Sequence, residues 1–136
     1  MGAIQVIAVD TSALVAILVR EPEADAFLMS LEQADSIVMS PVSLLEINMV
    51  IRGEKGYESI SDLEQLLADA EIKIWPFDEA MAKVAVTAFV DYGRGSGSSA
   101  KLNFGDCASY ALAKSLDIPL LFKGADFVHT DIVSAV

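Results

Sequence analysis

The chain has 136 residues and a hydrophobic content of 54%, which predict one domain, residues 1–136, with a core large enough to fold without disulfides. Its single cysteine, Cys107, excludes an intramolecular disulfide and fits a reducing compartment. The longest strongly apolar run, 13–19, is far shorter than the ~20 residues of a membrane helix, and no signal-peptide pattern is present, so we expect a soluble, cytoplasmic protein. The net charge of −11 excludes a broad surface for nucleic acid and favours a basic protein partner.

The first half of the chain alternates strand and helix patterns. Residues 4–9 are rich in β-branched side chains and predict a buried strand. We expect a short helix to follow, capped by Asp10, Thr11 or Ser12, and Pro22 to lie in the first turn of a second helix.

A second strand is predicted at 37–39. The pair 40–41, Ser-Pro, is typical of a helix start and predicts the helix that carries Glu46. We expect Gly53 and Gly56 to end this helix.

The second half continues the alternation. The Ser-Asp-Leu-Glu segment at 61–64 has the pattern of a capping box, and Asp78 is placed to cap a later helix. A glycine- and serine-rich loop at 93–99 precedes a helix that we expect to begin at Gly105 or Asp106. Further strands are predicted at 72–75, at 120–122 and near 132–133.

This alternation predicts an α/β fold with a mainly parallel central sheet of four or five strands and helices on both faces. In such sheets, ligands bind beyond the carboxyl ends of the strands. Asp10 and Asp126 both follow predicted strands, and Asp106 heads a helix that leads into one. We therefore expect these three acids to share one end of the sheet.

Four acidic residues occupy positions that are unusual for an acid, and Glu46 is the most informative of them. On a helix its neighbours are Val42, Met49 and Val50, so we expect it on the apolar face, where a carboxylate needs a partner. Carboxylates forced together repel unless a cation neutralises them. The set predicts a divalent metal site formed by Asp10, Glu46, Asp106 and Asp126.

Each acid also has a purely structural interpretation. Asp10 is also explained by a helix cap alone, and Asp106 by a favourable interaction with a helix dipole. Glu46 is also explained by an ion pair with a buried Arg or Lys. Asp126 lies in an ordinary turn composition, and Asp131 competes with it for the same role.

The remaining residue types narrow the chemistry. His129 is the only histidine, and there is neither a cysteine cluster for zinc nor a glycine-rich phosphate loop. Oxygen ligands alone suit Mg²⁺ or Mn²⁺, which activate water and stabilise the charge that develops on a phosphodiester under attack. Thr11 or Ser12 could hydrogen-bond the carboxylates or a phosphate oxygen, and Ser109 and Tyr110 flank Asp106 one helical turn away.

Four short segments occur in an order and spacing that are more specific than any one of them. They are Val-Asp-Thr-Ser-Ala at 9–13, Leu-Leu-Glu at 44–46, Asn-Phe-Gly-Asp-Cys at 103–107 and Leu-Phe-Lys-Gly-Ala-Asp-Phe at 121–127. Together they resemble the PIN-domain ribonucleases, specifically the VapC-type toxins of bacterial toxin–antitoxin pairs, and the resemblance covers nearly the whole chain.

The resemblance implies a parallel sheet wrapped by helices and a metal-binding core of Asp10, Glu46 and Asp106. It also implies a fourth acid, which many PIN domains carry where this chain has Gly124; Asp126 is the nearest candidate, with Asp131 in reserve. It further implies an RNA substrate, a homodimer and a VapB-type antitoxin that blocks the acidic pocket with a basic side chain.

Two other functions are compatible with an α/β chain of this kind. A receiver-like phosphoacceptor module would share the acid after the first strand and a late lysine, Lys123, but needs two adjacent acids where this chain has Asp10 and Thr11. The second alternative is a PIN-like protein that has lost catalysis and only binds its partner.

Overall fold

The structure, a computed structural model, describes residues 3–54 and 57–136. Its described part contains a four-stranded sheet in the order β3-β2-β1-β4, and every neighbouring pair is parallel. Ala8 in the central strand pairs with Val38 on one side and with Leu120 on the other. The strands are β1 (Val6–Val9), β2 (Ser36–Met39), β3 (Lys73–Ile74) and β4 (Leu120–Leu121).

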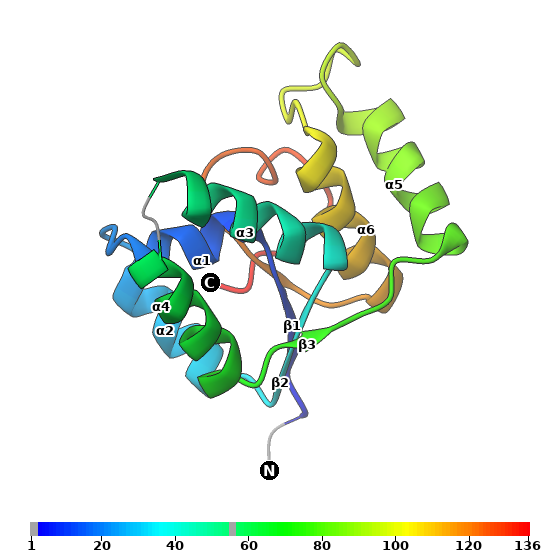
Figure 1. Cartoon of the computed structure of the whole chain (residues 1–136). Helices are drawn as coiled ribbons and strands as arrows, with labels where there is room; N and C mark the ends of the chain where they lie inside the picture. The colour runs from blue at the N-terminus through cyan, green and yellow to red at the C-terminus, as the bar shows by residue number, and fades with distance from the viewer. Residues whose placement is uncertain (1–2, 55–56) are drawn as a thin grey trace.

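Helices cover both faces of the sheet, as the sequence predicted. Because alternate residues of a strand point to opposite faces, Ile7 and Val9 pack with α1 to α4, whereas Ala8 and Leu120 pack with α5 and α6. Figure 1 shows α5 and α6 on one side of the strands and α1, α2 and α4 on the other. The helices are α1 (Thr11–Leu18), α2 (Ala24–Gln33), α3 (Pro41–Glu54), α4 (Tyr57–Asp69), α5 (Glu79–Tyr92) and α6 (Phe104–Leu116).

The predicted helix caps after the strands are largely confirmed. The Asp10 carboxylate accepts the backbone N–H of Ser12 at the start of α1, and Asp78 accepts that of Met81 at the start of α5. Ser40 in turn accepts the N–H of Val42 at the start of α3. Short polar side chains at these positions satisfy N–H groups that have no partner within the helix.

Several predicted boundaries in the first half are wrong. Pro22 lies in a turn before α2, which begins only at Ala24. Gly53 lies within α3 rather than after it, because a helix tolerates an exposed glycine at a cost of only about 1 kcal/mol; Gly56 lies outside the described residues. The segment 61–64 is inside α4, so its capping-box pattern does not start a helix.

Two predictions in the second half also need correction. The helix that carries Asp106 begins at Phe104 and is capped by Asn103, so Asp106 is its third residue. The segment near 132–133 forms no strand in the described residues. It makes an isolated parallel bridge from Ser134 to Leu120, because the chain here follows β4 for only one residue pair.

The carboxyl ends of the strands are where the site residues gather. The backbone N–H of Asp10, just beyond β1, donates to the carbonyl of Leu121 at the end of β4 (2.9 Å). This bond fixes the first acid beside the segment that leads to Asp126. Within the two described stretches, no helix combines the length and the apolar character that crossing a membrane would demand.

Candidate acidic metal site

Asp10 is a buried carboxylate held by two serines. Only 3% of the residue is exposed. Its Oδ2 accepts the Ser12 hydroxyl at 2.6 Å and the Ser12 backbone N–H at 3.0 Å, and its Oδ1 accepts the Ser109 hydroxyl at 2.5 Å. The helix-cap interpretation of Asp10 is therefore confirmed, and three donors fix the orientation of its carboxylate.

Asp106 is placed by a capping box at the start of α6. Its Oδ2 accepts the N–H of Asn103, while its own N–H donates to the Asn103 side chain. Burial raises the pKa of Asp106 to about 7; the Asn103 N–H opposes this shift, and the charges of Asp10 and Asp126 add to it. A carboxyl with a pKa near neutrality beside two other acids is typical of a functional site.

Asp126 reaches this pair from the segment after β4. The residue is exposed at the surface, and its carboxyl group lies near enough to Asp106 to raise the pKa of that acid. The preceding Gly124 has a φ of +104°, a conformation that favours glycine and turns the chain between β4 and Asp126. The charges of Asp10 and Asp126 therefore both act on Asp106, although the three acids come from separate segments.

Glu46 lies on α3 with its carboxylate against Gly105. A Cβ added to Gly105 would lie 2.5 Å from Glu46 Oε2 and 2.8 Å from Oε1, so the carboxylate can occupy this position only because residue 105 lacks a side chain. The expected apolar burial is wrong in degree. Glu46 is only partly buried, and its neighbour Met49 is 65% exposed, because this face of α3 lies at the surface near the site rather than in the core.

The supporting candidates separate into different roles. Ser12 contacts Asp10 and also accepts the backbone N–H of Lys123 at 3.0 Å, so it joins α1 to the segment that carries Asp126. Thr11 is buried, and its hydroxyl donates to the carbonyl of Ser43 rather than to an acid.

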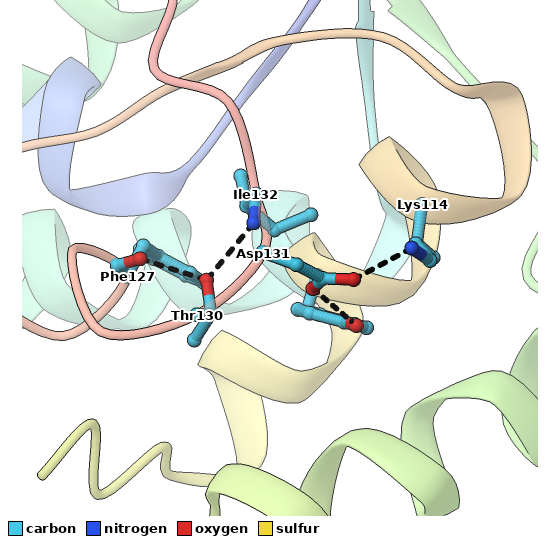
Figure 2. Close-up of polar contacts among 6 residues, drawn as sticks. Lys114, Phe127, Thr130, Asp131 and Ile132 are labelled. Carbon is cyan, nitrogen blue, oxygen red and sulfur yellow. Dashed lines mark hydrogen bonds and ion pairs between the residues drawn. The ribbon is translucent and has the colours of Figure 1, made fainter.

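Asp131 is engaged with α6, one and two turns beyond Asp106. One of its oxygens accepts the Tyr110 hydroxyl at 2.7 Å and the other accepts the Lys114 ammonium at 2.6 Å. Figure 2 shows these bonds beside the turn in which Thr130 donates to Phe127 and accepts from Ile132. Between the two candidates for the fourth acid, it is Asp126 whose carboxyl lies near Asp106.

Sequence reasoning missed Ser43 and the close contact at Gly105. Ser43 is fully buried, and its hydroxyl hydrogen-bonds that of Ser109 at 3.1 Å. The signal was its spacing: Ser43 lies one helical turn before Glu46, as Ser109 lies one turn after Asp106. Cys107 is buried in the core, and burial raises the pKa of its thiol.

The donor set consists of carboxylate oxygens, which fits a hard divalent cation such as Mg²⁺ or Mn²⁺. Among the described residues, no three His, Cys, Asp or Glu side chains already form a group that could hold a metal ion. Burial raises the pKa of Asp106, the charges of Asp10 and Asp126 raise it further, and a bound cation would relieve this electrostatic cost.

Comparisons with known proteins identify the family of the chain. The pattern of the PIN domain family matches residues 7–133. The chain is 44% identical over 128 residues to the Ribonuclease VapC28 of Mycobacterium tuberculosis, covering 94% of this chain and 96% of that protein. It is 43% identical over 124 residues to the Ribonuclease VapC42 of the same species, covering 91% and 95%.

Solved structures share the fold at low sequence identity. The VapC20 toxin of Mycobacterium tuberculosis superposes with a TM-score of 0.75 at 15% identity, covering 93% of this chain and 96% of that one. The VapBC2 structure from Rickettsia felis gives a TM-score of 0.74 at 13% identity, with coverage of 96% and 97%. By its family pattern and its relatives, the chain belongs to the PIN-domain family and, within it, to the VapC ribonucleases.

Proposed function

We propose that this chain is a divalent-metal-dependent endoribonuclease and the toxin of a VapBC-type toxin–antitoxin pair that acts in the cytoplasm. The observation that carries this proposal is that Asp10 and Asp126 lie near enough to Asp106, at the carboxyl edge of the sheet, to raise its pKa. The relatives that bear the name ribonuclease match nearly the whole chain, so the activity assigned to them extends to the domain described here.

Within this proposal Asp10 and Asp106 hold the metal, Glu46 ligates it or orients a bound water, and Asp126 completes the set. A bound Mg²⁺ or Mn²⁺ supplies activation of water and stabilisation of the charge on the phosphodiester. The protein keeps Asp10 in one orientation through Ser12 and Ser109, and it brings Glu46 to the same region across Gly105.

The partners follow from the family and from the charge. The solved neighbours include a VapBC structure bound to a promoter DNA fragment and a toxin–antitoxin complex from Klebsiella pneumoniae. We propose a VapB-type antitoxin for this chain, a homodimeric toxin, and RNA as substrate. A net charge of −11 favours binding of a basic antitoxin segment at the acidic site. Because the same charge repels RNA phosphate, a bound divalent cation would provide the positive charge that the phosphate contacts.

The receiver-like alternative gains no support from the structure. That function needs the late lysine near the phosphoacceptor, but the Lys123 ammonium pairs with Glu21 and, at 3.4 Å, with Glu23. A domain that only binds its partner is the remaining alternative, and the assay below separates it from the proposed enzyme.

The test is RNA cleavage by the purified chain with Mg²⁺, with Mn²⁺ and with excess chelator. We expect cleavage with metal, none with chelator, and recovery when metal is restored. Asp106→Asn should abolish cleavage while retaining the fold, because Asn keeps an oxygen for the Asn103 N–H. Cleavage by Asp106→Asn at the native rate, or no cleavage by the unaltered protein with either metal, would contradict the proposal.

A further inference from the structure

Behind Asp10 lies a buried chain of hydroxyl groups. Ser109 donates to Asp10 Oδ1 at 2.5 Å, and the Ser43 hydroxyl lies 3.1 Å from that of Ser109. Ser43 and Ser109 are 0% and 1% exposed. The distance of 2.5 Å is that of a charge-assisted O–H···O⁻ bond, which is among the stronger hydrogen bonds in proteins.

The donor and the acceptor in each of these hydrogen bonds follow from the number of protons that each group carries. A serine hydroxyl has one proton to donate, and an ionised carboxylate only accepts. With Asp10 ionised, the Ser109 proton is committed to Asp10, so the bond between the serines must run from Ser43 to Ser109. Both hydroxyl dipoles therefore point toward the carboxylate and stabilise it in series.

The same two serines connect the helices that carry the other acids. Ser43 lies on α3 one turn before Glu46, and Ser109 lies on α6 one turn after Asp106. Thr11 adds a further link, because its hydroxyl donates to the backbone carbonyl of Ser43. The hydroxyl pair thus sets both the orientation of Asp10 and the approach of α3 to α6 beside it.

We propose that Ser109, backed by Ser43, is a positioning residue for metal binding by Asp10: its hydrogen bond to Oδ1 holds the carboxylate in one orientation. This inference rests on the proposed function. Hydrogen bonds to a metal ligand typically contribute about 10- to 100-fold in metal affinity or activity, because they set the orientation and basicity of the ligand.

The decisive variants are Ser109→Ala, Ser43→Ala and the double variant, with Ser40→Ala as the matched control. Ser40 is equally buried and caps the start of α3, but its hydroxyl accepts the backbone N–H of Val42 and makes no hydrogen bond to Asp10. Titration calorimetry measures the Kd for Mn²⁺ alone, steady-state kinetics measure kcat and KM for RNA, and circular dichroism with chemical denaturation reports folding.

We expect Ser109→Ala to raise the Kd for Mn²⁺ and to lower kcat by about tenfold or more, with KM for RNA little changed. Ser43→Ala should act in the same direction but more weakly. Because the two hydroxyls act in series, the double variant should resemble Ser109→Ala rather than the product of the two single effects. Ser40→Ala should lower stability and leave the Kd unchanged.

An unchanged Mn²⁺ Kd in Ser109→Ala would overturn the inference, as would equal weakening by Ser40→Ala or independent effects of the two serines. A protein that binds Mn²⁺ with this serine dependence but cleaves no RNA would contradict the proposed function and support the positioning role. A chain that binds no Mn²⁺ would contradict both.

Discussion

Asp106 in α6 and Asp126 after β4 lie close enough for the charge of Asp126 to raise the pKa of Asp106, although they come from separate segments of the chain. Burial is the larger cause, and together with the charges of Asp10 and Asp126 it raises the pKa of Asp106 to about 7. Ionisation of Asp106 therefore lowers the stability of the folded chain.

The first prediction is that the metal-free protein loses stability as the pH rises through the neutral range. The folded pKa of Asp106, about 7, exceeds its ordinary value of 3.8, so the folded state binds more protons between these limits. Stability is then fully present below the unfolded pKa and is lost progressively as the pH rises through the folded one. Urea unfolding in chelator between pH 4 and pH 8 measures the slope.

Asp106→Asn supplies the control for this slope. It keeps an acceptor for the Asn103 N–H but removes the ionisation, so its free energy of unfolding should vary less across the same range and exceed that of the unaltered chain at pH 8. We expect the difference to be a few kcal/mol. An Asp106→Asn variant that is less stable than the parent at pH 8 would contradict this account of the site.

The second prediction concerns the contact between Gly105 and Glu46. In Gly105→Ala the new Cβ would meet both carboxylate oxygens of Glu46, at 2.5 and 2.8 Å, and would displace this flexible end of the side chain rather than the backbone. We expect RNA cleavage to fall by up to about 100-fold, as displacement of a group by 1 Å can cost this much, while thermal unfolding changes little.

Gly53→Ala is the matched control on α3. Nothing lies within 4 Å of a Cβ added at Gly53, and the residue is inside the helix. The substitution should therefore stabilise the chain by about 0.5–1 kcal/mol and leave cleavage unchanged. Native cleavage by Gly105→Ala would show that the position of Glu46 does not matter for the reaction.

The order of strands and helices could be predicted from the sequence because strand and helix periodicities differ and the chain contains few ambiguous segments. The helix starts at Asp10 and Asp78 were found because short polar side chains follow the strands directly. The start of α4 was missed because its capping-box pattern lies inside the helix, where local propensity does not decide the boundary.

The acids could be named from sequence, but their contacts could not. Asp10 and Ser109 are 99 positions apart, and only the packing of α6 against β1 brings them together. Sequence also left Asp126 and Asp131 as alternatives, since both follow β4 in polar segments. The two acids differ in the groups that they contact, and those contacts depend on the tertiary fold. Asp131 accepts hydrogen bonds from Tyr110 and Lys114, whereas Asp126 lies near Asp106.

The third prediction separates these two acids. Asp131→Ala removes the acceptor of the partly buried Tyr110 hydroxyl, a loss of about 0.5–1.5 kcal/mol, and should leave the Mn²⁺ affinity unchanged. Asp126→Asn should instead weaken Mn²⁺ binding with little loss of stability, because Asp126 is exposed. Calorimetry and denaturation of both variants make the comparison, and the reverse pattern would assign the site role to Asp131.

The effect of Asp131 should also depend on pH. Burial alone would raise the pKa of Asp131, but hydrogen bonds from Lys114 and Tyr110 outweigh it and lower that pKa below its ordinary value. A carboxylate with a lowered folded pKa contributes stability above the unfolded pKa, and this contribution is lost as the pH falls through the folded one. The difference between Asp131→Ala and the parent should therefore shrink in acid.

The last prediction concerns Phe127, which anchors the segment that carries Asp126. Phe127 is 1% exposed and packs on Phe122 with ring centroids 5.1 Å apart. Phe127→Ala should lower the free energy of unfolding by about 3–5 kcal/mol, because it removes apolar burial and leaves a cavity beneath Asp126.

The neighbouring Val128 provides the comparison, since it is 58% exposed. Val128→Ala should change stability by less than about 0.5 kcal/mol. Phe127→Ala should also weaken Mn²⁺ binding under conditions where the variant is still folded, because Asp126 then loses its fixed position beside Asp106. Retained affinity in a folded, destabilised Phe127→Ala protein would mean that the proximity of Asp126 to Asp106 does not depend on this anchor.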